Sequence, residues 1–383
     1  MKRFIAFSIM LCILATICCA SMQIVSYADS SVDITSKSAC LVDFDSGDVL
    51  YEKDATTHLP VASMVKMMTI LLTLEEYEKG NLSDETMIST TENASSMGGS
   101  QVFIDPYVEY TAKDMLKSVI MASANDASVA LAEHISGSEE NFVVKMNERA
   151  KELGMNDTNY VNCTGLPAPE QYSCAKDSAC VLKEVAKFDK YHEFSTIWMD
   201  ELVHPSGRKT ELVNTNRLVR YYEGCDGGKT GSTNEAGCCL TATAKRNNMR
   251  LISVVIGAKN SQTRFNECSK LFNYGFANFE SRKILDCQKA IEILPVGKGK
   301  INEVEIFSAE DFAVTTRKGQ ESDIEVTYSL PEKVSAPTKS GQVIGKAILS
   351  KDGNLIKEID VIVKTDIDKL SFKDCLDRVA SAW

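Results

Sequence analysis

Three short motifs carry the residue types that transfer an acyl group through a serine hydroxyl. In chain order they are Ser63-Met64-Val65-Lys66, Ser123-Ala124-Asn125 and Lys229-Thr230-Gly231. A serine hydroxyl is a poor nucleophile until a base removes its proton. Residues three positions apart share one face of a helix, so the amine of Lys66 can reach the hydroxyl of Ser63. The first motif therefore offers a nucleophile and its general base.

Lys66 can act as a base only if its amine is neutral at the working pH. Burial and a second cation nearby, which Lys229 can supply, both lower the pKa of a lysine. If Ser63 begins a helix, free backbone N–H groups and the helix dipole also face the negative charge that develops during attack. An apolar run from Met67 to Leu74 follows the motif. That run predicts a buried helix behind the nucleophile.

The second and third motifs offer the groups that complete such a site. The hydroxyl of Ser123 can relay a proton between a lysine and a leaving group, and Asn125 can donate its amide to a carbonyl oxygen. The alternative is a capping serine and a turn asparagine. Lys229 and the Thr230 hydroxyl suit a terminal carboxylate. Gly231 allows a bound backbone to lie close, as an added strand would.

The Ser-x-x-Lys pattern is weak evidence by itself, because the chain contains it twice more. The other copies are Ser173-Cys174-Ala175-Lys176 and Ser206-Gly207-Arg208-Lys209. Ser63 is the predicted nucleophile because both partner motifs and a buried helix follow it. A phosphate loop is a rival interpretation of the segment from Gly224 to Thr230. It fails by one position, since the first glycine of that motif would have to stand at Glu223.

The rest of the sequence predicts the elements that hold these motifs. A turn-rich tetrapeptide at 45–48 predicts a hairpin over 38–53. Apolar periodicity predicts the remaining elements of the first part, which are helices over 63–79, 111–136, 142–153 and 263–280 and strands over 238–244 and 251–256. From about Ala290, short alternating segments separated by Gly and Pro predict a small all-β domain.

Both ends of the chain carry signals for a place outside the cytoplasm. Lys2 and Arg3, the apolar run from Phe4 to Ala20 and the small residues of Ser26-Tyr27-Ala28 predict an export leader cleaved after Ala28. Cleavage after Ala20 and an uncleaved anchor are the alternatives. From Asp366 the apolar side chains fall on one helical face. We expect a helix there that lies in a membrane interface, or one that docks on its own domain.

Composition excludes some classes of function. The 383-residue chain has a formal net charge of −11 and no long basic run, so no nucleic-acid partner is expected. Thirteen cysteines are many for an exported chain, but most of those after the leader fall in apolar segments, where free Cys behaves as a small hydrophobe. No Cys-x-x-Cys pair occurs, so no metal site is expected, and nothing in the sequence calls for a cofactor.

The motifs together resemble those of the serine-type D-alanyl-D-alanine carboxypeptidases, the low-molecular-mass penicillin-binding proteins. The segments that carry the resemblance are 95–100, 123–127, 226–231 and 249–252. It implies an α+β catalytic domain of the β-lactamase/transpeptidase type, with an antiparallel sheet and helices on both faces, followed by the small all-β domain. The implied organisation is a signal peptide at 1–28, the catalytic domain at 29–288, a small β-sandwich at 289–365 and an amphipathic membrane-anchoring helix at 366–383.

The resemblance also implies a reaction. Ser63 would attack the peptide bond between the two terminal D-Ala residues of a peptidoglycan stem pentapeptide, and penicillins would acylate the same hydroxyl. The backbone N–H groups of Ser63 and Ser232 would form the oxyanion hole. Arg264 matches the arginine that lies near the substrate carboxylate in this family. Its alternative is a surface arginine at a helix start.

The sequence departs from the family pattern at two positions, and two rival functions remain open. Gln171 stands where many relatives have His, and Gly228 replaces a larger residue before Lys229. Both could alter substrate preference or the rate of deacylation.

A serine β-lactamase is one rival function, because Glu152-Leu153-Gly154-Met155-Asn156 resembles its Glu-x-x-Leu-Asn signature. A sensor that is acylated without turnover is the other. The extra β domain and the terminal helix favour the carboxypeptidase.

Overall fold

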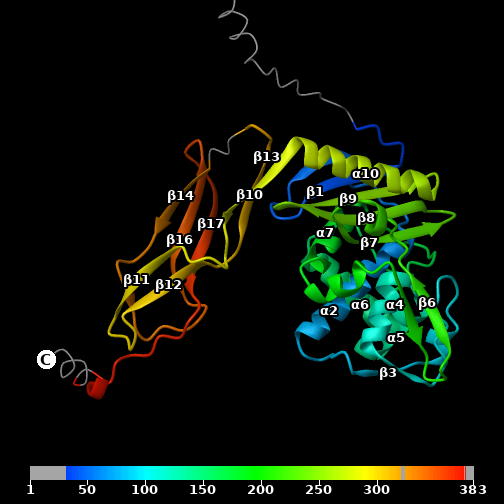
Figure 1. The fold of residues 1–383 in the computed structure, drawn as a ribbon, viewed down its shortest axis with the longest axis horizontal. Coiled ribbons are helices and arrows are strands. Elements are labelled where there is room, and N and C mark those ends of the chain that lie inside the picture. Colours follow the sequence, from blue (N-terminus) through cyan, green and yellow to red (C-terminus); the bar gives the residue numbers. More distant parts are fainter. Residues whose placement is uncertain (1–31, 321–323, 375, 377–383) are drawn as a thin grey trace, which may run out of the picture. The chain divides into compact units, whose positions relative to one another are not determined.

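A five-stranded antiparallel sheet forms the centre of the catalytic part (Figure 1). The computed structural model describes residues 32–320, 324–374 and 376. The strand order is β2-β1-β9-β8-β7, with bounds Val49–Lys53, Ser38–Asp43, Met249–Ala258, Gly237–Arg246 and Cys225–Thr233. The first two form the predicted hairpin, and β7, which carries Lys229-Thr230-Gly231, lies at an edge of the sheet. One side of β7 is therefore not paired with another strand of this sheet.

Helices cover both faces of this sheet (Figure 1). Helix α10 (Ser261–Asn278) packs on β8 and β9 from one side, and α7 (Ala175–Val185) packs on β1 and β9 from the other. Helix α2 (Lys66–Glu78) lies deeper and is buried from Lys66 through Leu74. A helix that is apolar almost all round has no solvent face, which explains this central position.

The second motif lies where one predicted helix breaks into two. Helix α4 (Ala112–Ala122) ends at Ser123, which has φ 62° and ψ 32°, and α5 (Asn125–Ser136) begins two residues later. Asx and small polar residues tolerate this left-handed conformation better than bulky ones, so the break falls at the motif. The other helices and hairpins of this part are η1 (Ala62–Val65), α3 (Glu92–Ser95), α6 (Glu139–Glu152), α8 (Asp189–Ser195), α9 (Leu218–Tyr221), β3 (Met87–Ser89), β4 (Glu109–Thr111), β5 (Met199–Val203) and β6 (Lys209–Val213).

The C-terminal part is all-β and has a core of its own. Strands β10 (Phe279–Leu285) and β13 (Phe312–Arg317) form a two-stranded ribbon. A second sheet has the order β14-β16-β17-β12-β11-β15, with bounds Ile324–Ser329, Val343–Lys351, Asn354–Val363, Glu303–Ser308, Glu292–Gly297 and Val334–Ser335. Alternate residues are buried in β12 and in parts of β16 and β17, as expected for strands with one solvated face.

The observed architecture confirms the predicted fold class, an α+β catalytic domain followed by a small all-β domain. Several strands were not predicted. Strand β7 contains three glycines, a composition that ordinarily weakens a strand, and its edge position and pairing with β8 determine its conformation. The domain boundary at 288/289 stays a prediction.

The helix that the sequence predicts from Asp366 onward is not helical over its first residues. Ile367 and Lys369 form β-bridges, and Ile367 is buried in the second core, so this segment continues the β domain instead. Helical residues begin at Phe372, and most of the predicted helix lies outside the described residues, as does the predicted leader. Among the residues described, no helix has both the length and the apolar character that crossing a bilayer requires.

Candidate active site

Ser63 and Lys66 lie side by side at the start of the central helix. Ser63 is in the 3-10 turn η1, and Lys66 is the first residue of α2. The Nζ of Lys66 lies 3.0 Å from the Oγ of Ser63, which is hydrogen-bond distance. The predicted nucleophile and base are therefore in contact.

The surroundings of Lys66 favour its neutral amine. The side chain is fully buried, and burial lowers the pKa of Lys66 from 10.5 to about 7. Cys163 and Asp126 oppose this shift more weakly. The Nζ also donates to the carbonyl oxygen of Thr164 at 2.5 Å. This acceptor leaves the amine oriented toward Ser63, as general-base catalysis requires.

Two glycines lie close against the backbone just before Ser63. A Cβ on Gly165 would lie 2.1 Å from the carbonyl oxygen of Ala62, and one on Gly231 would lie 2.4 Å from that of Val61. Neither position has room for a larger residue. The loop after Thr164 and strand β7 thus clamp the segment that carries the nucleophile. Gly231 is needed for close backbone approach, although the approaching backbone is that of the protein itself.

Ser123 and Asn125 approach the site from the α4–α5 junction. The Oγ of Ser123 is buried and has no hydrogen-bond partner among the described residues, and neither has the Oδ1 of Asn125. The Nδ2 of Asn125 donates to the carbonyl oxygen of Gly98 at 2.6 Å, and its backbone N–H donates to that of Ser100 at 2.7 Å. Asn125 therefore fixes the 98–100 loop beside the site. The unpaired hydroxyl of Ser123 is free to take part in proton transfer.

Lys229 is buried on β7 with weak polar support. Its Nζ donates to the carbonyl oxygen of Thr230 at 3.3 Å, and the side chain is 1% exposed. Burial, with contributions from the positive charges of Lys66 and Arg264, places the pKa of Lys229 well below 10.5. An anion bound here would offset that effect.

Arg264 lies on α10 and lines the cavity that contains Ser63, but it donates its hydrogen bonds to backbone carbonyl oxygens of the protein. One guanidinium nitrogen donates to the carbonyl oxygens of Gly231 at 3.0 Å and Cys239 at 3.3 Å. It therefore ties β7 to β8 while adding positive charge to the cavity. The Nε of Arg264 is buried and has no described partner.

Some of these residues open into one cavity of about 660 Å³, but Lys66, Asn125 and Lys229 are not among the residues that line it. Ser63, Ser123 and Thr230 lie in its wall, and none of the described residues that line it is acidic. Arg217 adds a further cation at the rim. The complete lining is Ser63, Ser100, Ser123, Trp198, Val213, Asn214, Thr215, Arg217, Tyr221, Thr230, Gly231, Ser232, Ser261, Arg264 and Phe265. A site of this size that holds cations and no acids suits an anionic ligand.

The competing sequence patterns lie elsewhere. Ser173 bonds Thr158 at 2.9 Å and packs away from solvent, whereas Ser206 is exposed in the β5–β6 turn. Glu152, which resembled the β-lactamase glutamate, ends α6 on the surface and pairs with Arg149 at 3.0 Å. None of these three residues lines the cavity of Ser63.

The two departures from the family pattern have different surroundings. Gln171 holds the loop after α6 together, because its Oε1 accepts from Val161 and Asn162 and its Nε2 donates to Leu166. Gly228 has φ +135°, a region that L side chains rarely adopt. A Cβ there would lie 2.3 Å from the carbonyl oxygen of Thr241.

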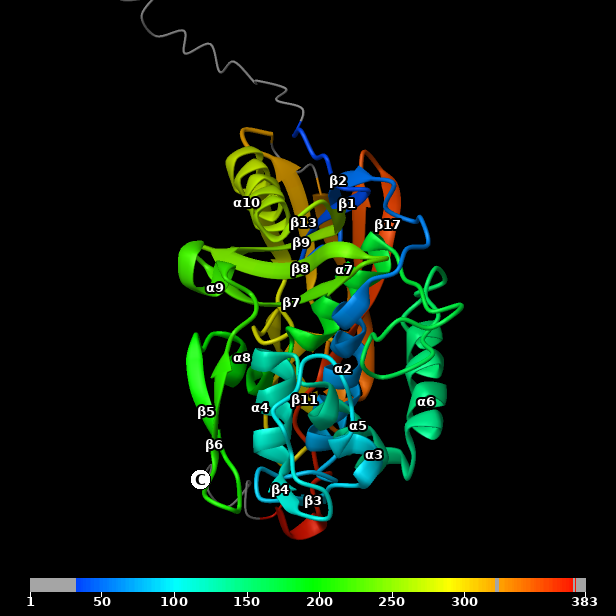
Figure 2. The same ribbon diagram turned by 90° about the vertical axis from the view of Figure 1, so that its right-hand side faces the viewer.

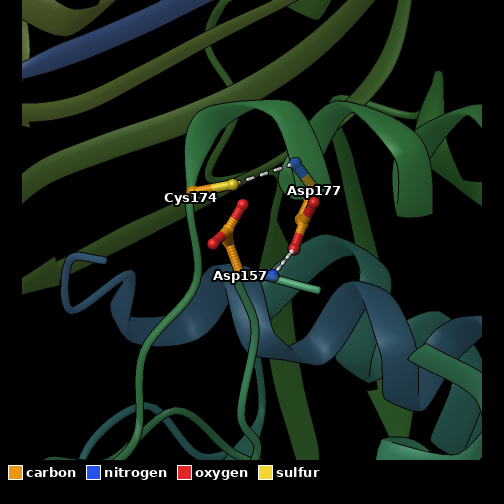
Figure 3. Close-up of side chains that lie close together, drawn as sticks. All are labelled: Asp157, Cys174 and Asp177. Atoms are coloured by element: carbon orange, nitrogen blue, oxygen red, sulfur yellow. Dashed lines mark hydrogen bonds between the residues drawn. The ribbon is translucent and has the colours of Figure 1, made fainter. Parts of the chain in front are cut away.

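One group of possible metal ligands stands out among the described residues, namely Asp157, Cys174 and Asp177 (Figure 3). The Sγ of Cys174 accepts the backbone N–H of Asp177 and caps α7. The Asp177 carboxylate accepts the backbone N–H of Asp157 at 2.9 Å. Burial raises the pKa of Cys174 to about 12, so the thiol keeps its proton. The arrangement is a helix cap that joins two segments.

Sequence reasoning missed the carbonyl group of Thr164 and the residues that support β7. A backbone carbonyl gives no sequence signal. Gly165, which follows Thr164 and has φ +80°, was the one residue that could have marked this loop.

Comparisons with known proteins agree with this geometry. The family model described as D-alanyl-D-alanine carboxypeptidase matches residues 24–260, and a second model, the C-terminal domain of penicillin-binding protein 5, matches 279–369. The chain is 42% identical to D-alanyl-D-alanine carboxypeptidase DacF of Bacillus subtilis, over 91% of this chain and 90% of that one. It is 35% identical to D-alanyl-D-alanine carboxypeptidase DacA of Haemophilus influenzae, over 87% and 86%.

A solved structure extends the likeness to three dimensions. Penicillin-binding protein 5 from Haemophilus influenzae superimposes with a TM-score of 0.70 at 33% identity, covering 89% of this chain and 99% of that one. The D-alanyl-D-alanine carboxypeptidase family model alone covers more than half of the chain. The contacts among Ser63, Lys66 and the cation-lined cavity fit this relationship, and the chain belongs to the D-alanyl-D-alanine carboxypeptidase family.

Proposed function

We propose that the protein is a serine-type D-alanyl-D-alanine carboxypeptidase of cell-wall maturation. It removes the terminal D-Ala from peptidoglycan stem pentapeptides through an acyl-enzyme on Ser63. The observation that carries this proposal is the 3.0 Å contact between the Ser63 hydroxyl and a buried lysine whose pKa is lowered to about 7. Family membership supplies the substrate class.

In the acylation step, Lys66 takes the hydroxyl proton as Ser63 attacks the carbonyl carbon between the two D-Ala residues. The negative charge on the carbonyl oxygen is stabilised by the backbone N–H groups of Ser63 and Ser232. Ser232 follows Gly231 on β7 and lines the cavity. One such donor contributes about 10²–10³-fold in rate.

The leaving amine needs a proton when the C–N bond breaks. Ser123 can pass it from Lys66, because its buried hydroxyl has no other described partner. D-Ala departs with its carboxylate, which Lys229, Thr230 and Arg264 hold during attack. A water molecule then hydrolyses the ester, with Lys66 acting again as base.

Release of D-Ala from diacetyl-L-Lys-D-Ala-D-Ala by the purified protein tests the proposal. Ser63→Ala should abolish both this release and labelling by a fluorescent penicillin. Ser173→Ala and Ser206→Ala are matched controls, because they remove the same hydroxyl from the same sequence pattern outside the cavity, and both should retain activity. Labelling of Ser63 without any D-Ala release would favour the sensor and contradict the carboxypeptidase.

The same site accounts for β-lactam binding, since a β-lactam presents a strained amide and a carboxylate. The surface position of Glu152 argues against rapid deacylation by a β-lactamase glutamate. A stable penicillin adduct is therefore expected. Rapid turnover of penicillin would favour the β-lactamase alternative.

We also propose that the protein is exported and acts on the outer face of the cytoplasmic membrane. The leader-like residues 1–28 and the apolar face after Phe372 support this placement. A variant ending at Ser371, which keeps the buried Ile367 of the β domain, should lose membrane association, which sedimentation with vesicles measures. Failure of the full-length protein to sediment would contradict peripheral attachment.

A further inference from the structure

Strand β7 offers an open edge to a bound peptide over part of its length. It is the last strand of its sheet, and alternate residues of such a strand direct their N–H and C=O groups away from the sheet. Gly228, Thr230 and Ser232 share that direction by their spacing. Thr230 and Ser232 line the active-site cavity, whereas Gly228 does not. The edge is therefore closed just before Lys229.

A buried tyrosine makes this closure. The backbone N–H of Gly228 donates to the hydroxyl of Tyr191, on α8, at 2.7 Å. Tyr191 is completely buried, and its ring lies so near Gly227 that a Cβ there would be 2.7 Å from a ring carbon. Asn216 holds the same peptide group from its other side, because its Nδ2 donates to the carbonyl oxygen of Gly227 at 3.0 Å, and the C=O and N–H of a trans peptide point in opposite directions.

Helix α8 supports the same stretch at one more point. The hydroxyl of Ser195 donates to the carbonyl oxygen of Asp226 at 2.6 Å, and the Nδ1 of His192 lies 3.2 Å from that oxygen. Figure 2 shows α8 below the edge of the sheet that β7 forms. Side chains of α8 thus occupy polar groups that a continuing substrate strand would otherwise need.

We infer that Tyr191 and Ser195 are positioning residues that close the leaving-group end of the substrate groove and limit the leaving group to one residue. The inference rests on the proposed function, which sets the direction of the peptide. With the scissile carbonyl at Ser63 and the terminal carboxylate at Lys229, a further residue would run toward Gly228. It would find that N–H bonded and the adjoining space filled.

A substrate with one extra residue, diacetyl-L-Lys-D-Ala-D-Ala-D-Ala, reports this limit directly. Hydrolysis of the last bond releases D-Ala, and hydrolysis one bond earlier releases the dipeptide D-Ala-D-Ala, each with one water consumed. The ratio of the two initial products does not depend on how much protein is active. For the unaltered full-length protein we expect the dipeptide to be about a hundredfold rarer than D-Ala.

Tyr191→Phe removes one oxygen and frees the Gly228 N–H, so the dipeptide share should rise about tenfold. Ser195→Ala is a second variant that frees the Asp226 carbonyl oxygen without touching Tyr191, and it should act in the same direction. Tyr160→Phe is the matched control. It also removes a hydroxyl from a buried tyrosine, but one beside Asp177 and Cys174 instead of Gly228, and it should leave the product ratio unchanged.

An unchanged product ratio in both edge variants, with D-Ala still released, would overturn the inference. So would abundant dipeptide from the unaltered protein, or an equal rise in the Tyr160→Phe control. If the unaltered protein releases neither product, the proposed function itself fails, and the inference fails with it. Mass spectrometry of the early products distinguishes these outcomes.

Discussion

The start of helix α2 and the edge strand β7 each carry a buried lysine next to a residue of the cavity wall, but they hold it differently. Lys66 has two acceptors within 3.0 Å, the Ser63 hydroxyl and the Thr164 carbonyl. Lys229 has one longer contact, 3.3 Å to Thr230. Burial lowers both pKa values. The difference indicates that Lys66 is preorganised as a base, whereas Lys229 is left to pair with an incoming anion.

Replacing each lysine by arginine should give the largest difference in acylation rate between the two positions. Lys66→Arg should reduce acylation by fluorescent penicillin about 10⁴-fold, because a guanidinium keeps its proton and cannot act as a base. Lys229→Arg keeps the positive charge and should lose only about tenfold, or ~1.4 kcal/mol of activation free energy. Stopped-flow labelling measures both rates. Equal losses would show that the two lysines share one role.

The clamp around Ser63 should be the next most sensitive feature. Gly231→Ala places a Cβ 2.4 Å from the Val61 carbonyl oxygen, so the backbone beside the nucleophile must move. A displacement of this kind should slow D-Ala release about 100-fold. Gly98→Ala is the control, since a Cβ there meets no atom within 4 Å although the residue borders the site. The two variants should differ in kcat far more than in thermal stability.

The pH dependence of acylation tests whether Lys66, at the start of α2, is the general base. With a pKa of about 7, Lys66 is mostly protonated below pH 7, so acylation should fall about tenfold for each further pH unit. Acylation rates from pH 5 to 9 in one buffer series measure this. A rate that stays level down to pH 5 would contradict the assignment of Lys66 as base.

The smallest effect should be on stability. The pKa of Lys66 is lower in the folded protein than in the unfolded chain, so the unfolded chain binds more protons between about pH 7 and 10.5. Stability should therefore rise with pH across that window. Lys66→Met removes the burial cost and should raise Tm at pH 7, by about 2–4 °C per kcal/mol. The gain should shrink as the pH approaches 10, which calorimetry can follow.

The sequence predicted those parts of the site that repeat along a helix or follow a motif. The apolar run after Lys66 marked the buried helix, and the helix predicted over 111–136 covers both α4 and α5. Side chains that meet only in the folded protein were missed. Tyr191 and Asn216 reach β7 from separate segments, and the Thr164 carbonyl carries no side-chain signal.

The β domain also contains a segment whose conformation the sequence did not predict. Its alternating strands were recognisable, but Ile367 was assigned to a helix because the apolar spacing of the last residues suits one. Its burial in the second core outweighs that local pattern. Tertiary contacts decided the conformation where two periodicities overlapped.

The described residues of the cavity wall include no acid, so a bound carboxylate would meet only positive charge there. Burial holds the pKa of Lys229 well below 10.5, and an arriving carboxylate would raise it. Once the C–N bond breaks and D-Ala carries its carboxylate away, the same burial would lower the pKa again. The proton affinity of Lys229 would therefore rise and fall with each peptide that enters and leaves.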